Sequence, residues 1–170
     1  MGLFGKMKKE LLEWQKIVMV DNPDELTLNQ KQLQQISNQQ AADDLRIIQD
    51  CIKIISETTN PDTFFMRLDL LKERAAHLTL LGPYVKFTGS SPTAAAKEVV
   101  DQEQTAIYNF IIRYYSVVFD KAESLKTARG KKNQFQKFFD SLEKYLERMN
   151  ESNLNYITYK KRRFKENYPE

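Results

Sequence analysis

Cysteine and histidine each occur only once in this chain, as Cys51 and His77. One cysteine cannot form an internal disulfide bond, and together these two residues cannot supply the four ligands of a structural zinc site. A zinc protease of the His-Glu-x-x-His type needs a second histidine, as does a di-iron bundle with paired Glu-x-x-His motifs. We therefore expect no metal and no cofactor, and a lone thiol suits a reducing compartment.

The surroundings of these two residues also argue against catalysis. Cys51 lies among isoleucines on a predicted helix, and a free cysteine in that setting usually packs as a small apolar side chain. A reactive thiolate needs a nearby cation or helix N-terminus, and only Lys53 is close in sequence. His77 has no partner residue at the spacing of any catalytic template, because Arg67 and Arg74 both miss the spacing of helical ribonucleases. The sequence predicts that the protein is not an enzyme.

Long apolar runs are missing as well. A bilayer-spanning helix needs about 20 apolar residues, and the longest candidates here are residues 17–20 and 78–81. The first residues lack the apolar stretch and cleavage site of a signal peptide, and Lys6 stands where a myristoylation motif needs Ser or Thr. We expect a cytoplasmic protein without a transmembrane segment.

Proline and glycine are scarce, with five of each, and most of the prolines mark helix boundaries. Three prolines follow a residue that commonly caps a helix, at Asn22-Pro23, Asn60-Pro61 and Ser91-Pro92, and Gly82-Pro83 follows a periodic run as a stop signal. Between Thr93 and Tyr168 there is no proline and one glycine, Gly130. This predicts one long helix from residue 92 to 129, which Gly130 separates from the next.

Apolar residues recur at helical spacing, and no segment alternates like a strand. The predicted fold is all-α, an elongated antiparallel helical bundle of four main helices with short helices at the N- and C-terminal ends. Leu71 and Phe138 represent the predicted core, as do Leu45, Ile48, Ile52 and Ile55 of the second helix, and Ser152 is expected to cap the last short one. Residues 1–40 are expected to be an appended amphipathic helix and a Gln-rich helical or linker segment, and residues 41–170 the bundle domain.

Three segments resemble a recurrent helical module of Gram-positive bacteria and their phages. They are NPDTFFMRLDLLKE at 60–73, YVKFTG at 84–89 and KAESLKTARGKKNQFQKFFDSLEKY at 121–145. The residues that match the first block are Asn60, Pro61, Phe64, Phe65, Arg67, Asp69, Leu70 and Leu71. The likeness covers roughly residues 42–159 and implies a cytoplasmic or phage-associated helical protein. The family has no assigned activity, so the resemblance names no substrate.

The first predicted helix carries an apolar stripe that needs a partner surface. Its members are Phe4, Met7, Leu11, Trp14 and Val18, spaced three and four residues apart. The stripe is expected to contact a protein partner or a second copy of the chain. The protein's own bundle and an anionic membrane surface are the alternatives.

Basic residues concentrate in the last part of the chain. Residues 101–170 contain 14 Lys and Arg against 10 Asp and Glu, whereas residues 1–100 contain 12 against 13. Such a cluster is commonly a solvated helix end, but it also makes nucleic-acid contact a candidate role. The candidate residues are Lys126, Arg129, Lys131, Lys132, Lys137, Lys160, Lys161, Arg162, Arg163 and Lys165.

These observations favour a non-catalytic helical module for protein–protein interaction or scaffolding. The first alternative is a nonspecific nucleic-acid-binding protein that uses the basic C-terminal region. The second is a protein that associates with a membrane surface through the N-terminal amphipathic helix.

Overall fold

The computed structural model describes residues 23–82, 85, 97–98 and 100–168 of the chain. Over these residues the protein is all-helical, with no strand, which confirms the predicted fold class. The helices are α2 (Pro23–Glu57), α3 (Pro61–Leu81), α5 (Glu103–Glu123), α6 (Ala128–Glu143) and α7 (Glu151–Asn167), with a short 3-10 helix η2 (Leu146–Arg148) before α7.

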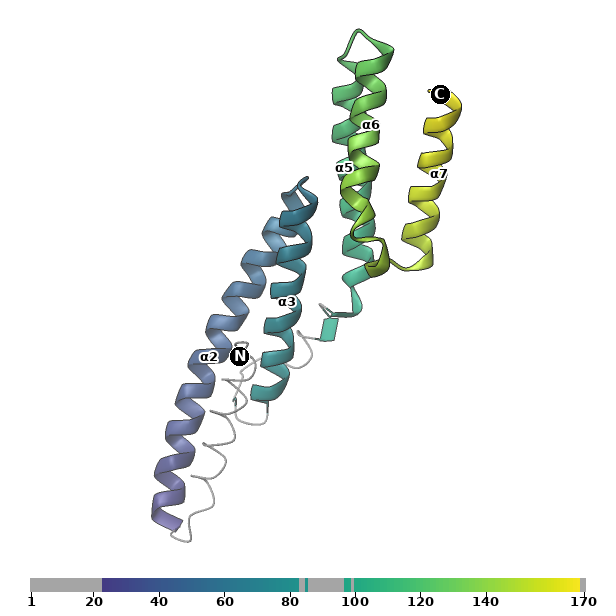
Figure 1. The fold of residues 1–170 in the computed structure, drawn as a ribbon. Helices are drawn as coiled ribbons and strands as arrows, with labels where there is room; N and C mark the ends of the chain where they lie inside the picture. The colour runs from purple at the N-terminus through teal and green to yellow at the C-terminus, as the bar shows by residue number, and fades with distance from the viewer. Residues whose placement is uncertain (1–22, 83–84, 86–96, 99, 169–170) are drawn as a thin grey trace.

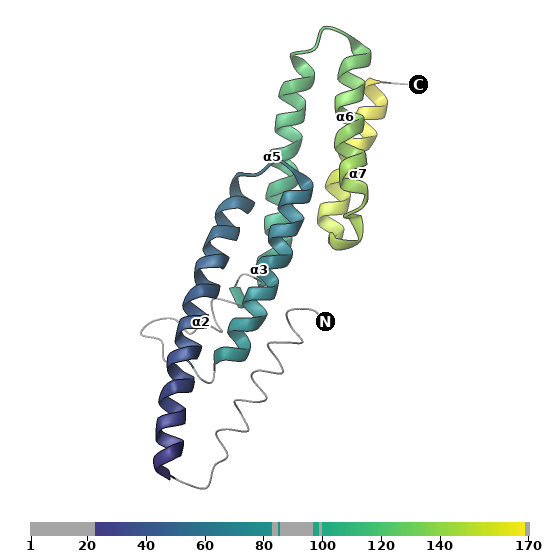
Figure 2. The ribbon, with the colours of Figure 1, turned by 60° about the vertical axis from the view of Figure 1, so that its left-hand side comes forward.

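The helices form two antiparallel hairpins that are displaced along the long axis of an elongated molecule (Figures 1 and 2). The hairpins consist of α2 with α3 and of α5 with α6. They overlap where the α2–α3 turn lies beside the first half of α5, and α7 lies alongside α5 and α6. The free end of the second hairpin is the α5–α6 turn, and α7 runs toward it.

Aromatic side chains fill the region where the hairpins overlap. The ring of Phe64 stacks on that of Phe110, with centroids 4.1 Å apart, and Phe65 stacks on Tyr145 at 3.9 Å. One continuous cluster of buried side chains joins both hairpins and α7. A second, smaller cluster lies between α2 and α3 and includes Ala41, Ile48 and Leu78.

The predicted core positions are confirmed except for Ile52, and Leu45 is only partly buried. Leu71 is 3% exposed and Phe138 is fully buried, and Ile48 and Ile55 are buried on α2. Ile52, which the spacing assigned to the same buried stripe, is 46% exposed. Successive residues of a helix point about 100° apart, and at this place on α2 the Cys51 side chain faces the core while Ile52 points outward.

The proline signals locate the start of α3 correctly. Asn60 caps this helix, its side-chain oxygen accepting a hydrogen bond from the Thr63 amide at 3.0 Å, and Pro61 is the first helical residue. Gly82 follows the last residue of α3 in a right-handed conformation. Helix α2 continues without a break through residue 40, so the domain boundary expected there falls inside one helix.

The predicted helix from 92 to 129 is wrong at its C-terminal end. Helix α5 ends at Glu123, and Thr127 caps α6 by accepting a hydrogen bond from the Gly130 amide at 3.1 Å. Gly130 therefore lies in the first turn of α6 and does not separate α5 from α6. A Cβ atom at this glycine would lie 2.9 Å from the Thr127 hydroxyl oxygen, so the missing side chain leaves room for the cap.

The last helix also differs from the prediction. Asn150, rather than Ser152, caps α7, because its side-chain oxygen accepts a hydrogen bond from the Asn153 amide at 3.0 Å. Helix α7 has 17 residues and is not a short segment. Its buried side chains include Ile157 and Phe164, which pack against the second hairpin.

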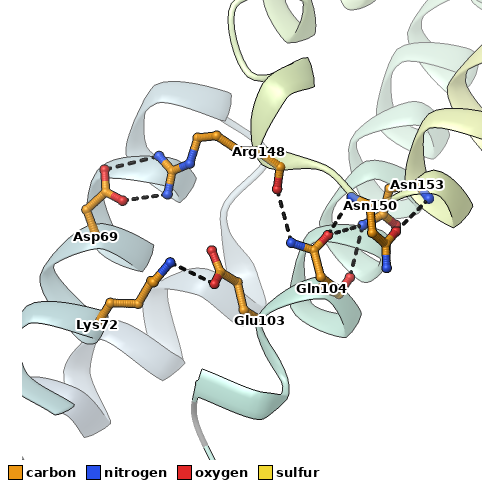
Figure 3. Close-up of polar contacts among 7 residues, drawn as sticks. All are labelled: Asp69, Lys72, Glu103, Gln104, Arg148, Asn150 and Asn153. Carbon is orange, nitrogen blue, oxygen red and sulfur yellow. Dashed lines mark hydrogen bonds and ion pairs between the residues drawn. The ribbon is translucent and has the colours of Figure 1, made fainter. Parts of the chain in front are cut away.

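A polar cluster around Gln104 sets the position of α7 relative to α5 (Figure 3). The Gln104 amide nitrogen donates to the Arg148 carbonyl oxygen at 3.0 Å. Its amide oxygen accepts hydrogen bonds from the Asn150 backbone and the Asn153 side chain, both at 2.9 Å. The Asn153 side chain, which is almost fully buried, also donates to the Gln104 carbonyl oxygen. Both polar atoms of the Gln104 side chain thus have partners in the segment that begins α7.

Charged pairs join the same cluster to the first hairpin. Arg148 binds both carboxylate oxygens of Asp69 on α3, and Lys72 lies 2.8 Å from Glu103 (Figure 3). A two-point contact between arginine and carboxylate fixes orientation as well as distance. The guanidinium of Arg148 also lies 4.9 Å from the centre of the Phe65 ring.

Arg113 on α5 holds the C-terminal end of α2. Its guanidinium donates to the carbonyl oxygens of Ile55 at 2.7 Å and of Thr58 at 2.9 and 3.1 Å. The last carbonyls of a helix have no partner within the helix, and a cation complements the negative end of its dipole. The contact therefore satisfies the end of α2 and attaches it to the second hairpin.

Candidate interaction surface

One side of α5 carries a row of large side chains that α7 only partly covers. Tyr108, Ile112, Tyr115 and Phe119 are four, three and four residues apart, which places them on one face of the helix. Ile112 is 38% and Phe119 45% exposed, whereas both tyrosines are partly buried. The ring edge of Tyr156 from α7 meets Tyr108, with centroids 5.6 Å apart. We call these five side chains the aromatic face.

Lys160 of α7 lies over the aromatic face. Its ammonium nitrogen is 4.2 Å from the ring centre of Tyr115 and 5.3 Å from that of Tyr156. A cation above a tyrosine ring is attracted by the negative charge of the ring face. Lys160 was predicted as a nucleic-acid contact, and the structure directs its charge toward these rings.

A pocket of about 210 Å³ opens at the end of the aromatic face, between α5, α6 and α7. Its walls are mainly rings, two of them tyrosines, and the other lining residues contribute one carboxylate, one guanidinium and one amide. The lining residues are Tyr115, Phe119, Phe135, Phe164, Tyr168, Glu123, Arg163 and Asn167. Phe135 lies 5.9 Å from both Phe164 and Tyr168, ring centre to ring centre, so the floor is a packed aromatic cluster.

Two tyrosines at this surface, Tyr115 and Tyr156, have a raised pKa and are neutral at physiological pH. Burial raises the pKa of Tyr115 above its ordinary value, and the neighbouring Tyr159 and Tyr168 raise it further. Burial raises the pKa of Tyr156 in the same way, with smaller contributions from Tyr108 and Tyr115. Their hydroxyl groups therefore remain hydrogen-bond donors as well as acceptors.

The structure brings the two predicted basic groups to one end of the molecule. The first group lies at the α5–α6 turn and the start of α6, and the second lies on the C-terminal half of α7 (Figure 1). We call residues 120–137 and 160–166 the basic end. It contains 11 Lys and Arg against 3 Asp and Glu, whereas the rest of the chain contains 15 against 20.

Some of these cations are paired within the basic end. Lys131 lies 3.1 Å from Glu123, and Arg163 lies 3.1 Å from Glu166, which Arg162 also approaches. Such exposed pairs contribute little stability, but they restrict the directions of the long side chains. The exposed cations of the basic end include Lys126, Arg129, Lys161 and Lys165.

The sequence prediction missed the aromatic half of this surface. The spacing of Tyr108, Tyr115 and Phe119 was a detectable signal, since it defines a second face on α5 beside the buried one. What the spacing could not show is that α7 returns along this face. The predicted N-terminal stripe of Phe4, Met7, Leu11, Trp14 and Val18 lies outside the residues that the structure describes.

His77 belongs to a buried polar contact between α2 and α3. Its Nδ1 is hydrogen-bonded to Oδ2 of Asp44, and Arg74 donates to the other oxygen of the same carboxylate at 3.2 Å. Asp44 and His77 are 2% and 5% exposed. The contact joins two helices in the interior and does not line the pocket described above.

Cys51 is fully buried in the core, as its apolar neighbours predicted. Burial raises the pKa of its thiol, and the nearby Arg67 opposes this effect. A buried thiol with a raised pKa is a poor nucleophile, because the thiolate is the reactive form. Among the side chains that the structure describes, no group of three or more His, Cys, Asp and Glu is placed to hold a metal ion.

No helix within the described ranges is both long and apolar enough to cross a membrane. Comparison of the chain with protein-family models, with curated proteins and with solved structures finds no significant match. The resemblance to the Gram-positive helical module therefore stays a prediction. The residues of the chain alone must carry a functional argument.

Proposed function

We propose that this protein is a non-catalytic helical interaction module, and that its binding surface is the aromatic face together with the basic end. The single observation that carries the proposal is the exposed aromatic pocket between α5, α6 and α7. Half-exposed rings in a recess are typical of binding sites, because their apolar area becomes buried when a ligand enters.

The rest of the molecule supports this reading as a scaffold. The only histidine is engaged in a buried contact that joins α2 to α3, and the only cysteine packs in the core. The Gln104 cluster and the Arg113 contact hold α5 and α7 in register with the first hairpin. We extend the proposal to the predicted antiparallel bundle of four main helices, which the two hairpins would form where they overlap.

Site-specific photo-crosslinking tests the proposal. Phe119 is replaced by a benzophenone-bearing phenylalanine, which keeps an aromatic ring at the rim of the pocket, and the full chain is produced in the native host. We expect irradiation to yield adducts with another macromolecule. A matched variant carries the same group at Met66, which is 56% exposed on α3, away from the aromatic face. Equal adduct yields at the two positions would contradict the proposed binding surface.

A further inference from the structure

We propose that the aromatic face and the basic end bind single-stranded nucleic acid, RNA or DNA. Bases would stack at the pocket around Phe119, and phosphates would contact the cations of α6 and α7. This inference rests on the proposed function, because it names the partner of the same surface.

Exposed rings and cations lie next to each other on this surface. Proteins that bind single strands combine a positively charged groove with aromatic side chains on which bases stack. Here Phe119 and Tyr159 each leave nearly half of the side chain exposed, and the Arg162 guanidinium lies 5.8 Å from the Tyr159 ring centre. The basic end has a net charge of +8, whereas the whole chain has a net charge of only +3.

The pocket combines aromatic rings with polar side chains. A nucleobase has an apolar face and an edge with hydrogen-bond donors and acceptors. The pocket offers aromatic walls for the face, and Glu123, Arg163 and Asn167 for the edge.

The recess favours single strands over duplexes. In a duplex the base faces are stacked on one another, so rings inside a recess cannot reach them. Phe119 and Tyr115 lie in a recess between α5 and α7, which admits an unstacked base. The cations of the basic end alone would bind duplex and single strand alike.

Fluorescence anisotropy with labelled oligonucleotides of about 20 nucleotides, longer than typical single-strand sites, tests the inference on the full chain. The probes are single-stranded RNA, single-stranded DNA and the DNA duplex of the same sequence, each of mixed sequence. We expect the single strands to bind more tightly than the duplex, and affinity to fall steeply between about 50 and about 200 mM salt. The difference in affinity between single-stranded RNA and single-stranded DNA would show whether the 2′-hydroxyl contributes to binding.

Matched variants separate stacking from charge. Phe119→Ala should weaken single-strand binding by about 5- to 150-fold, the range for losing one stacked base. Val117→Ala removes an equally exposed apolar side chain from another face of α5 and should change nothing. Replacing Arg162 and Arg163 by Gln should reduce the slope of log affinity against log salt by about 1.4. Replacing the exposed Lys53 and Lys97 by Gln should leave this slope unchanged.

Two binding results would overturn the inference. One is the absence of binding to any single strand at about 50 mM salt. The other is equal binding of duplex and single strand, with Phe119→Ala indistinguishable from Val117→Ala. If the crosslinks from position 119 join protein and never nucleic acid, the inference fails while the proposed interaction module stands. If position 119 gives no more adducts than position 66, the proposed function fails as well.

Discussion

Asp44 is an acidic side chain in the apolar interface between α2 and α3, and two side chains of α3 account for its presence there. Arg74 and His77 take one carboxylate oxygen each. Removing one member of a buried polar contact leaves the others without a partner in a medium of low dielectric constant. The contact therefore orders the pairing of the two helices, although the desolvation of its members offsets much of their attraction.

Asp44→Ala should lower the free energy of unfolding by about 3–5 kcal/mol, because Arg74 and His77 lose a buried partner. Asp43→Ala is the matched control, since Asp43 is exposed and pairs only with residues of its own helix. It should change the stability by less than about 0.5 kcal/mol. Urea denaturation followed by circular dichroism measures both, and equal midpoints for the two variants would show that the buried contact contributes nothing.

The outcome for His77 shows what can be deduced from single residues. The sequence predicted a structural or surface role from the missing partners of catalytic templates. The partner that the structure supplies, Asp44, is 33 residues away on another helix. Spacing within one helix cannot identify such a contact, because it depends on how α2 and α3 pair.

Helix α7 is positioned by polar contacts as well as by apolar packing. It touches the rest of the molecule through the aromatic face, through Ile157 and Phe164, and through the buried Asn153. The Gln104 side chain alone makes three hydrogen bonds to the segment from Arg148 to Asn153. One residue of α5 thus sets where α7 begins.

Gln104→Ala should cost about 1–3 kcal/mol, because three hydrogen bonds to the start of α7 are lost, one of them to the buried Asn153 side chain. Amide hydrogen exchange should become faster in α7 than in the unmodified protein, and it should stay unchanged in α2. Gln102→Ala is the control, since the exposed Gln102 side chain bonds only to Glu98 on its own helical turn. Unchanged exchange in α7 for both variants would mean that apolar packing alone positions the helix.

Helix boundaries were predictable where a local signal was decisive. Asn60 and Pro61 begin α3 through contacts within four residues, and such contacts can be read directly from sequence. The α5–α6 boundary has an equally local cause, the Thr127 cap, but the prediction gave weight to Gly130 instead. A glycine three residues after a threonine is compatible with a helix start as well as with a helix end.

For the molecule as a whole, the shared aromatic core determines how the hairpins behave together. Phe64 and Phe65 come from the first hairpin, and Phe110 comes from the second. Their rings are buried only because both hairpins are present. The helical spacing of the apolar residues can be read from the sequence, but the staggered arrangement arises from contacts between distant segments and could not be deduced from spacing.

Phe110→Ala should therefore lower the stability of both hairpins, by about 3–5 kcal/mol, and by equal amounts. Hydrogen exchange of the most protected amides in α3 and in α6 measures the two effects separately. Val117→Ala, on an exposed position of the same helix, should change neither by more than about 0.5 kcal/mol. Loss of protection in α6 with full protection in α3 would show that the hairpins are independent units.

The aromatic face and the basic end illustrate which part of a binding surface can be deduced from sequence. The cations were recognisable from composition, since Lys160 to Arg163 stand in one run. These cations lie near the α5–α6 turn because α6 runs antiparallel to α5 and α7 then runs back toward that turn. Charge density is a property of the sequence, but its coincidence with exposed rings is a property of the fold.

The Arg113 contact makes the two tight turns unequal in their tolerance of inserted sequence. The α2–α3 turn presents carbonyl oxygens to Arg113 and begins α3 at the Asn60 cap, so an added residue there would displace both. The turn at residues 124–127 is at the free end of the second hairpin, and most of its side chains are exposed. Exposed turns are where chains accept insertions and cleavage with least effect on folding. A genetically inserted tag or a change in loop length is therefore compatible with the fold at 124–127, whereas the α2–α3 turn must keep its length.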